Sequence, residues 1–141
     1  MPEFEKGDII GQRFYITEFL GEGTFGSVYL AYDSQWQDFI ALKTFRGVYN
    51  SNPEIREKIF REANLLIDLG HHPYLVDIYF IEFLSGRLYI GMQSIGSGES
   101  KSNTLEKYLE KNKIDLPQIL RWAIQFCIGI IYAYSKGVKC H

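Results

Sequence analysis

Six residues, Gly21 to Gly26, place three glycines at the spacing G-x-G-x-x-G. Glycine has no side chain to obstruct a ligand, so such a loop can bring its backbone N–H groups close to the oxygens of a phosphate. Three phosphate-binding structures contain closely spaced glycines: the turn of dinucleotide-binding folds, the Walker loop, and a glycine-rich hairpin that lies over a nucleotide. A hairpin that binds nothing is a fourth interpretation.

The residues that follow the glycines separate these interpretations. In the dinucleotide-binding fold the loop opens a helix, whose N-terminus holds the pyrophosphate, but Val28 to Ala31 form a strand-like run. A Walker loop needs Gly-Lys-Ser or Gly-Lys-Thr, which Gly26-Ser27-Val28 does not supply. The pattern therefore favours a glycine-rich hairpin over phosphate, with a hairpin that holds no ligand as the alternative.

Lys43 is a positive charge inside an apolar strand. In the run FIALKTF, residues 39–45, Ala41 and Phe45 share a face with Lys43, while Ile40 and Leu42 lie on the other face. A lysine at such a position could hold a phosphate. The alternative is a lysine at the sheet edge, whose charged end reaches water along its apolar stem.

Glu62 repeats this anomaly in the next predicted element, a helix that begins at Pro53 and ends before Gly70. It lies at the centre of a stripe spaced four, three, four and three residues apart: Ile55, Ile59, Glu62, Leu66 and Leu69. A buried lone charge is costly, so we expect Lys43 and Glu62 to form an ion pair that orients the lysine ammonium. The alternative is a glutamate at the rim of the stripe, satisfied by water or Arg61.

The remaining pattern divides the chain into two parts. Aromatic and β-branched runs predict three strands before the helix, over residues 13–20, 27–34 and 38–45, and two strands after it, over 74–84 and 87–95. The small, polar stretch 96–103 is typical of a linker. Two helices follow, and the second, about 116–136, is apolar nearly all round, as expected of a helix enclosed by other structure.

Composition excludes several classes of protein. The 141 residues suffice for one compact domain, and a net charge of −2 gives no basic excess that would favour nucleic acid or an anionic membrane surface. Two cysteines do not make a disulfide framework, so we expect a reducing, cytoplasmic environment. The longest uncharged run, Trp122 to Ser135, has 14 residues, which is short for a membrane span. We expect neither a span nor a metal site.

Taken together, these residues make the chain resemble the eukaryotic-type protein kinases. Gly21 to Val28 resembles their phosphate-covering loop, Ala41-Leu42-Lys43 their third-strand motif, and Glu62 their helix glutamate. Residues 72–76 resemble the turn into the fourth strand, and 88–95 resemble the fifth strand and the hinge. The resemblance covers nearly the whole chain, from about Phe14.

The resemblance implies an α+β fold. It consists of a kinase N-lobe with a five-stranded antiparallel sheet and one regulatory helix, a hinge, and the first two helices of an incomplete helical C-lobe. The implied boundaries are an N-terminal extension at 1–13, the N-lobe with its ATP-binding loop at 14–95, the hinge at 96–103 and the start of the C-lobe at 104–141.

The resemblance also implies a site for ATP. Lys43 and Glu62 would position the phosphates, and Met92 would be the gatekeeper. Backbone groups of Gln93 and Ile95 would bind the adenine edge, although most family members have glutamate in place of Gln93. The implied ATP-binding residues are Leu20, Gly21, Glu22, Gly23, Thr24, Phe25, Gly26, Ser27, Val28, Ala41, Lys43, Met92, Gln93 and Ile95.

His141 resembles the first residue of the family's His-Arg-Asp motif, and the sequence stops there. The catalytic Asp, the Mg²⁺-binding Asn and the Asp-Phe-Gly motif would follow it. We therefore expect this chain to be inactive, with Mg²⁺ expected only in a full-length kinase, so its status as an enzyme stays open. In the parent kinase the substrate would be a protein hydroxyl, with serine or threonine favoured over tyrosine.

Two other hypotheses stay open: a non-catalytic nucleotide-binding or scaffold module, such as a pseudokinase, and a small β-rich domain with no ligand. A stand-alone protein would not leave Trp122, Phe126, Ile130 and Ile131 facing water. We therefore expect a truncated gene product, a fragment, or a chain that self-associates through the apolar helix at 116–136.

Overall fold

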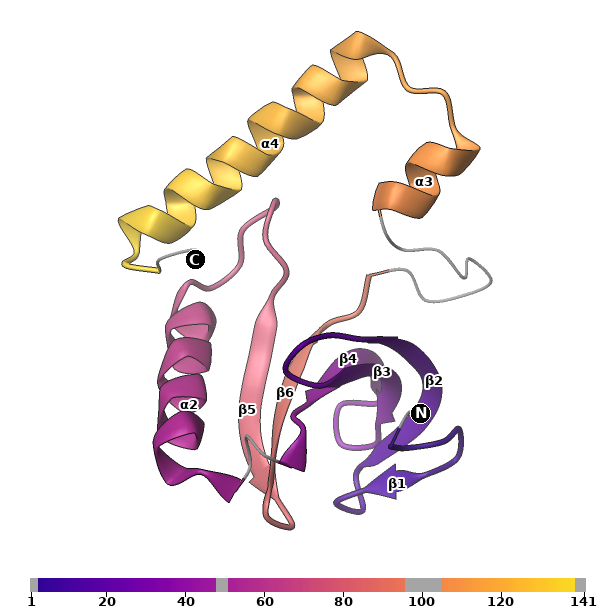
Figure 1. The fold of residues 1–141 in the computed structure, drawn as a ribbon, viewed down its shortest axis with the longest axis vertical. Coiled ribbons are helices and arrows are strands. Elements are labelled where there is room, and N and C mark those ends of the chain that lie inside the picture. The colour runs from indigo at the N-terminus through magenta and orange to yellow at the C-terminus, as the bar shows by residue number, and fades with distance from the viewer. Residues whose placement is uncertain (1–2, 48–50, 96–104, 139–141) are drawn as a thin grey trace.

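The chain forms one curled antiparallel sheet flanked by a helix, with two further helices beyond it (Figure 1). The computed structural model describes residues 3–47, 51–95 and 105–138. The strands lie in the order β1-β2-β3-β4-β6-β5, and each neighbouring pair is antiparallel. The strands are β1 (Ile9–Ile10), β2 (Phe14–Glu22), β3 (Ser27–Asp33), β4 (Asp38–Thr44), β5 (Ile78–Leu84) and β6 (Arg87–Gln93); the helices are α2 (Pro53–Asp68), α3 (Leu105–Lys111) and α4 (Leu116–Ser135).

All five predicted strands form, but the sheet has a sixth, β1, within the stretch predicted as an N-terminal extension. Backbone hydrogen bonds hold this stretch on β2: Gly7 N–H donates to Ile16 O at 2.8 Å, and Ile16 N–H donates to Asp8 O at 2.9 Å. A strand of two residues has no periodicity, so no sequence pattern signals it. The hinge predicted at 96–103 lies outside the described residues.

Each face of the sheet has its own apolar core. Ala63 of α2 packs on one face against Phe45, Leu88 and Ile90. The buried residues of the other face are Ile10, Phe14, Ile16, Tyr29, Ala31, Ile40, Leu42 and Tyr89. Gly91 faces this second core, where a Cβ atom would overlap the ring of Phe80. This close approach explains a glycine in the middle of β6.

A buried ion pair links β3 and β5 to the start of β2. Arg13 donates to Asp33 from Nε at 2.9 Å and from Nη2 at 2.6 Å, and to Glu82 from Nη1 at 2.8 Å. The side chain of Asp33 is fully buried, at 0% exposure. Burial alone would raise the pKa of Asp33, but hydrogen bonds from Arg13 and from two backbone N–H groups of the next turn lower it overall.

Helix α4 contacts the rest of the chain near its C-terminal end. The hydroxyl of Tyr132 donates to Leu69 O at 2.6 Å, and the ring of Tyr132 stacks on His72 with centroids 4.5 Å apart. Gly129 lies against the turn after α2, because a Cβ atom there would be 3.1 Å from Tyr74 O. The contact therefore attaches α4 to the connection between α2 and β5.

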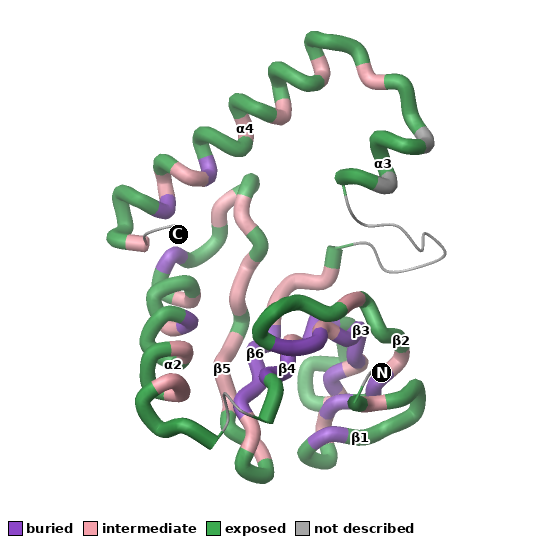
Figure 2. The backbone as a smooth tube through the Cα atoms, in the orientation of Figure 1, coloured by how far each residue is buried: buried purple, intermediate pink, exposed green. Residues whose placement is uncertain are grey.

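Much of the rest of α4 is exposed (Figure 2). Large apolar side chains more than 40% exposed are Leu116, Ile119, Leu120, Ile124, Phe126, Ile128, Ile131 and Tyr134. The helix is long and apolar enough to cross a membrane by length and composition, a criterion that core helices of soluble proteins also meet. The self-association expected through this helix stays a prediction.

Asp33→Asn should lower the free energy of unfolding by about 3 kcal/mol at neutral pH, because it removes one carboxylate from a buried guanidinium. The lowered pKa means that the carboxylate stabilises the fold above the pKa of the unfolded chain. This contribution is lost as the pH falls through the lower pKa of the folded state. Urea unfolding between about pH 7 and pH 3 should therefore show the penalty shrinking in acid.

Glu18→Gln, which removes an exposed carboxylate from β2, is the control for Asp33→Asn. It should change the free energy of unfolding by less than about 0.5 kcal/mol. A penalty for Asp33→Asn no larger than that of the control would contradict the prediction.

Candidate nucleotide-binding site

The register of three strands places four of the predicted ATP-binding residues on one face of the sheet. Val28 of β3 pairs with Lys43 of β4, and Ala41 of β4 pairs with Met92 of β6. Residues directly opposite each other point to the same face, and so do residues two apart along a strand. Val28, Ala41, Lys43 and Met92 are therefore neighbours, as the resemblance to kinases implies.

The glycine-rich loop is the turn between β2 and β3, and only its last glycine is crowded. Gly23 N–H donates to Gly26 O at 2.8 Å and closes the turn. A Cβ atom on Gly26 would overlap Thr44 O and lie 2.9 Å from Phe45 Cα, so the loop lies directly on the end of β4. A Cβ atom on Gly21 would meet nothing within 4 Å, and one on Gly23 would only touch Gly26 O at 4.0 Å.

The predicted ion pair between Lys43 and Glu62 is not formed in this structure. The ammonium of Lys43 lies 5.6 Å from the centroid of the Phe45 ring. Glu62 is exposed, with 60% of its side chain accessible, and its carboxylate lies 3.9 Å from the ammonium of Lys58. The expectation that Glu62 lies on the inward face of the helix is therefore wrong for this arrangement of α2.

The rotation of α2 explains this correction. Ala63 is the buried residue of the helix, and Ile59 packs beside it. Successive residues of an α-helix point about 100° apart, so a helix that turns Ala63 toward the sheet directs Glu62 to the side. The stripe read from the larger apolar residues omitted Ala63, because alanine is a weak marker of burial in sequence.

The end of β6 is tied by hydrogen bonds to Asp77, the residue before β5. Gln93 N–H donates to Asp77 O at 2.8 Å, and Asp77 N–H donates to the side-chain Oε1 of Gln93 at 3.4 Å. The N–H of Gln93 is therefore occupied, which leaves its carbonyl as the group for the predicted contact with adenine. A neutral amide here also avoids a second negative charge beside Asp77, which gives a physical reason for glutamine in place of the usual glutamate.

Arg46 is a residue of the site region that the sequence did not single out. It follows β4, and its Nη2 donates to Glu22 Oε1 at 2.8 Å and to Gly23 O at 3.3 Å. Its backbone N–H donates to Phe25 O at 3.0 Å. It lies beyond the last alternating residue of the strand, so no periodic pattern marks it.

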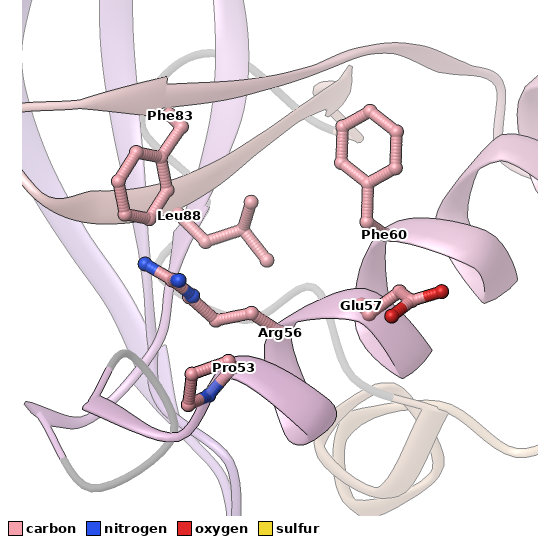
Figure 3. Close-up of a pocket in the computed structure, with 6 residues that line it drawn as sticks. All are labelled: Pro53, Arg56, Glu57, Phe60, Phe83 and Leu88. Carbon is pink, nitrogen blue, oxygen red and sulfur yellow. The ribbon is translucent and has the colours of Figure 1, made fainter.

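A separate apolar pocket of about 380 Å³ lies between the start of α2 and the turn joining β5 to β6 (Figure 3). In the wall of the pocket, the guanidinium of Arg56 lies over the Phe83 ring, 4.9 Å from its centroid. None of the residues that line it belongs to the predicted nucleotide site. In the part of the chain that the structure describes, no group of three or more His, Cys, Asp or Glu residues could hold a metal ion.

A curled antiparallel sheet that carries a glycine-rich hairpin above a lysine on one face and packs on a single helix is the N-terminal lobe of a protein kinase. The chain belongs to the protein kinase domain family, whose model matches residues 14–141.

Bacterial sequences are among its relatives. The chain is 29% identical over 143 residues to the serine/threonine-protein kinase PknD of Protochlamydia amoebophila, and 32% identical over 135 residues to PknD of Chlamydia trachomatis serovar D. These matches cover 92% and 90% of the chain, but only 14% of each relative. The chain thus spans about one seventh of the length of these curated relatives.

Solved structures show the same fold. A crystal structure of the Mycobacterium tuberculosis PknI kinase domain superposes with a TM-score of 0.72 at 18% identity. The match covers 95% of this chain and 53% of that domain. Because so little of the chain is left out, α4 is part of the matched fold.

Gly26→Ala should destabilise the lobe by about 2–4 kcal/mol, because its methyl group has no space beside Thr44 O. Gly23→Ala is the matched control within the same loop. It should change the free energy of unfolding by less than about 1 kcal/mol, since its methyl group would only touch Gly26 O at 4.0 Å. Equal effects of the two changes on the urea midpoint would contradict this assignment.

Proposed function

We propose that this chain is the ATP-binding part of a serine/threonine kinase. The observation that carries the proposal is the shared face of Val28, Ala41, Lys43 and Met92 beside a hairpin whose last glycine is fixed on β4. The adenine would lie between the apolar members of this face, and the ammonium of Lys43 would meet the phosphates. The names of the PknD relatives support serine or threonine as the acceptor in a longer protein.

In the arrangement that the structure shows, we expect Lys43 to bind the phosphates without forming an ion pair with Glu62. The ammonium is held by strand β4 and by the ring of Phe45. Glu62 would reach it only after α2 turned, which would bury a carboxylate that is now exposed beside Lys58. Glu62 therefore contributes little to ATP binding by this chain, and any orienting role belongs to a different position of the helix.

ATP should raise the melting temperature of the chain by about 3–5 °C when its concentration is about ten times its dissociation constant. Lys43→Met should abolish most of this shift, because the phosphates lose their cation. Glu62→Gln should keep it, since that carboxylate is exposed beside Lys58. The measurement is a thermal-shift titration, and adenosine serves as a ligand without phosphate. The proposal fails if millimolar ATP gives no shift in the unaltered chain.

We also propose that this chain does not transfer the phosphate it binds. Its 141 residues contain neither an Arg-Asp pair after a histidine nor an Asp-Phe-Gly motif. Phosphoryl transfer needs bound metal ions and a residue that orients the acceptor, and these motifs supply both in the family.

An assay with radiolabelled ATP and a mixture of acceptor proteins should therefore detect no transfer above background. The purified chain is compared with its own Lys43→Met variant, which gives the level of contaminating kinase activity. Turnover that copurifies with the unaltered chain and disappears in the variant would overturn the expectation of inactivity.

A further inference from the structure

We propose that Arg46 is a positioning residue of the nucleotide site: it holds the glycine-rich loop on the end of β4 and neutralises Glu22, so that the loop can cover an anion. This inference rests on the proposed binding of ATP. It adds a residue that no motif indicated, with a role distinct from that of Lys43.

The contacts of Arg46 reach both sides of the loop tip. The guanidinium donates to Glu22 Oε1 at 2.8 Å and to Gly23 O at 3.3 Å on the side of β2. The backbone N–H donates to Phe25 O at 3.0 Å on the side of β3. Arg46 therefore contacts both ends of the turn and holds the loop against the end of β4.

The contacts of a neighbouring residue strengthen this attachment. Thr44 Oγ1 donates to Ser27 O at 3.4 Å in a buried position, and Gly26 lies directly on Thr44 O. Thr44 and Arg46 thus contact the loop along its length, from Glu22 to Ser27. The strand that carries Lys43 and the loop that would cover the phosphates are held together as one unit.

The contact between Arg46 and Glu22 also neutralises a negative charge in the loop. Glu22 is the one ionisable residue between Gly21 and Gly26. A free carboxylate there would repel the phosphates beneath the loop, because like charges within about 10 Å interact appreciably at ordinary salt. The guanidinium of Arg46 removes this repulsion by pairing with the carboxylate.

The same pair contributes little to folding. Arg46 and Glu22 are 52% and 44% exposed, and exposed ion pairs have a median worth near zero in stability. Other cations near the lobe have their own contacts: Lys58 lies beside Glu62, and Arg61 donates to Glu57 at 2.8 Å. An effect of removing Arg46 should therefore be seen in ligand binding and not in the free energy of unfolding.

The test compares Arg46→Met with the unaltered chain by isothermal titration with ATP and with adenosine at about 50 mM salt. ATP should bind about three- to ten-fold more weakly to the variant, because the carboxylate of Glu22 is exposed to the phosphates. The affinity for adenosine and the urea midpoint should stay unchanged. The difference for ATP should decrease as salt is raised.

Two further variants identify the charge as the cause. Adding Glu22→Gln to Arg46→Met should restore ATP affinity to within about two-fold, since the repelling carboxylate is gone. Arg61→Met is the matched control, because it removes another exposed arginine–glutamate pair, on α2, with the same 2.8 Å contact. It should leave ATP affinity unchanged.

The outcomes separate this inference from the proposed function. If the unaltered chain binds ATP and Arg46→Met binds it equally well, the inference is overturned and the proposed function stands. An equal loss for ATP and adenosine, or no restoration by Glu22→Gln, would also overturn it. An unaltered chain that binds neither ligand would overturn the proposed function and the inference with it.

Discussion

Strand register is the constraint on which the site depends. Side chains alternate along a strand with a period of two, so a slip of β4 by one residue would move Lys43 to the opposite core. Gly26 opposes such a slip, because only a glycine fits against the end of β4. Gly91 fixes the register of β6 on β5, because only a glycine fits against the ring of Phe80. The buried pair of Arg13 and Asp33 fixes the far end of β3 in the same way.

The position of α2 shows how burial and charge compete. With Ala63 against the sheet, the helix approaches closely and its glutamate stays in water beside Lys58. The alternative, with Glu62 paired to Lys43, would remove two charges from solvent, and the attraction between them repays that cost only when the geometry is excellent. The helix is thus held on the sheet by the packing of its apolar face around Ala63, while its charged face stays in solvent.

The sequence was sufficient for features that repeat and insufficient for features that occur once. Alternation identified the five long strands and the face of Lys43, and the spacing of the glycines identified the loop. The two-residue β1 has no period. Two overlapping stripes fit α2, one that contains Glu62 and one that contains Ala63. The larger side chains favoured the stripe with Glu62, but the structure buries Ala63. Arg46 acts through contacts that form only when β4 and the loop meet, so no local pattern marks it.

The stretch before β2 determines how far the N-terminus of such a chain can be shortened without loss of contacts. The backbone N–H groups of Glu3 and Phe4 donate to the hydroxyl of the buried Tyr29 at 3.0 and 3.2 Å. Tyr29 is adjacent to Val28, which pairs with Lys43 on the face of the sheet where we propose that the nucleotide binds. A protein shortened to the family boundary at Phe14 would leave that hydroxyl without these donors and make β2 an unprotected edge.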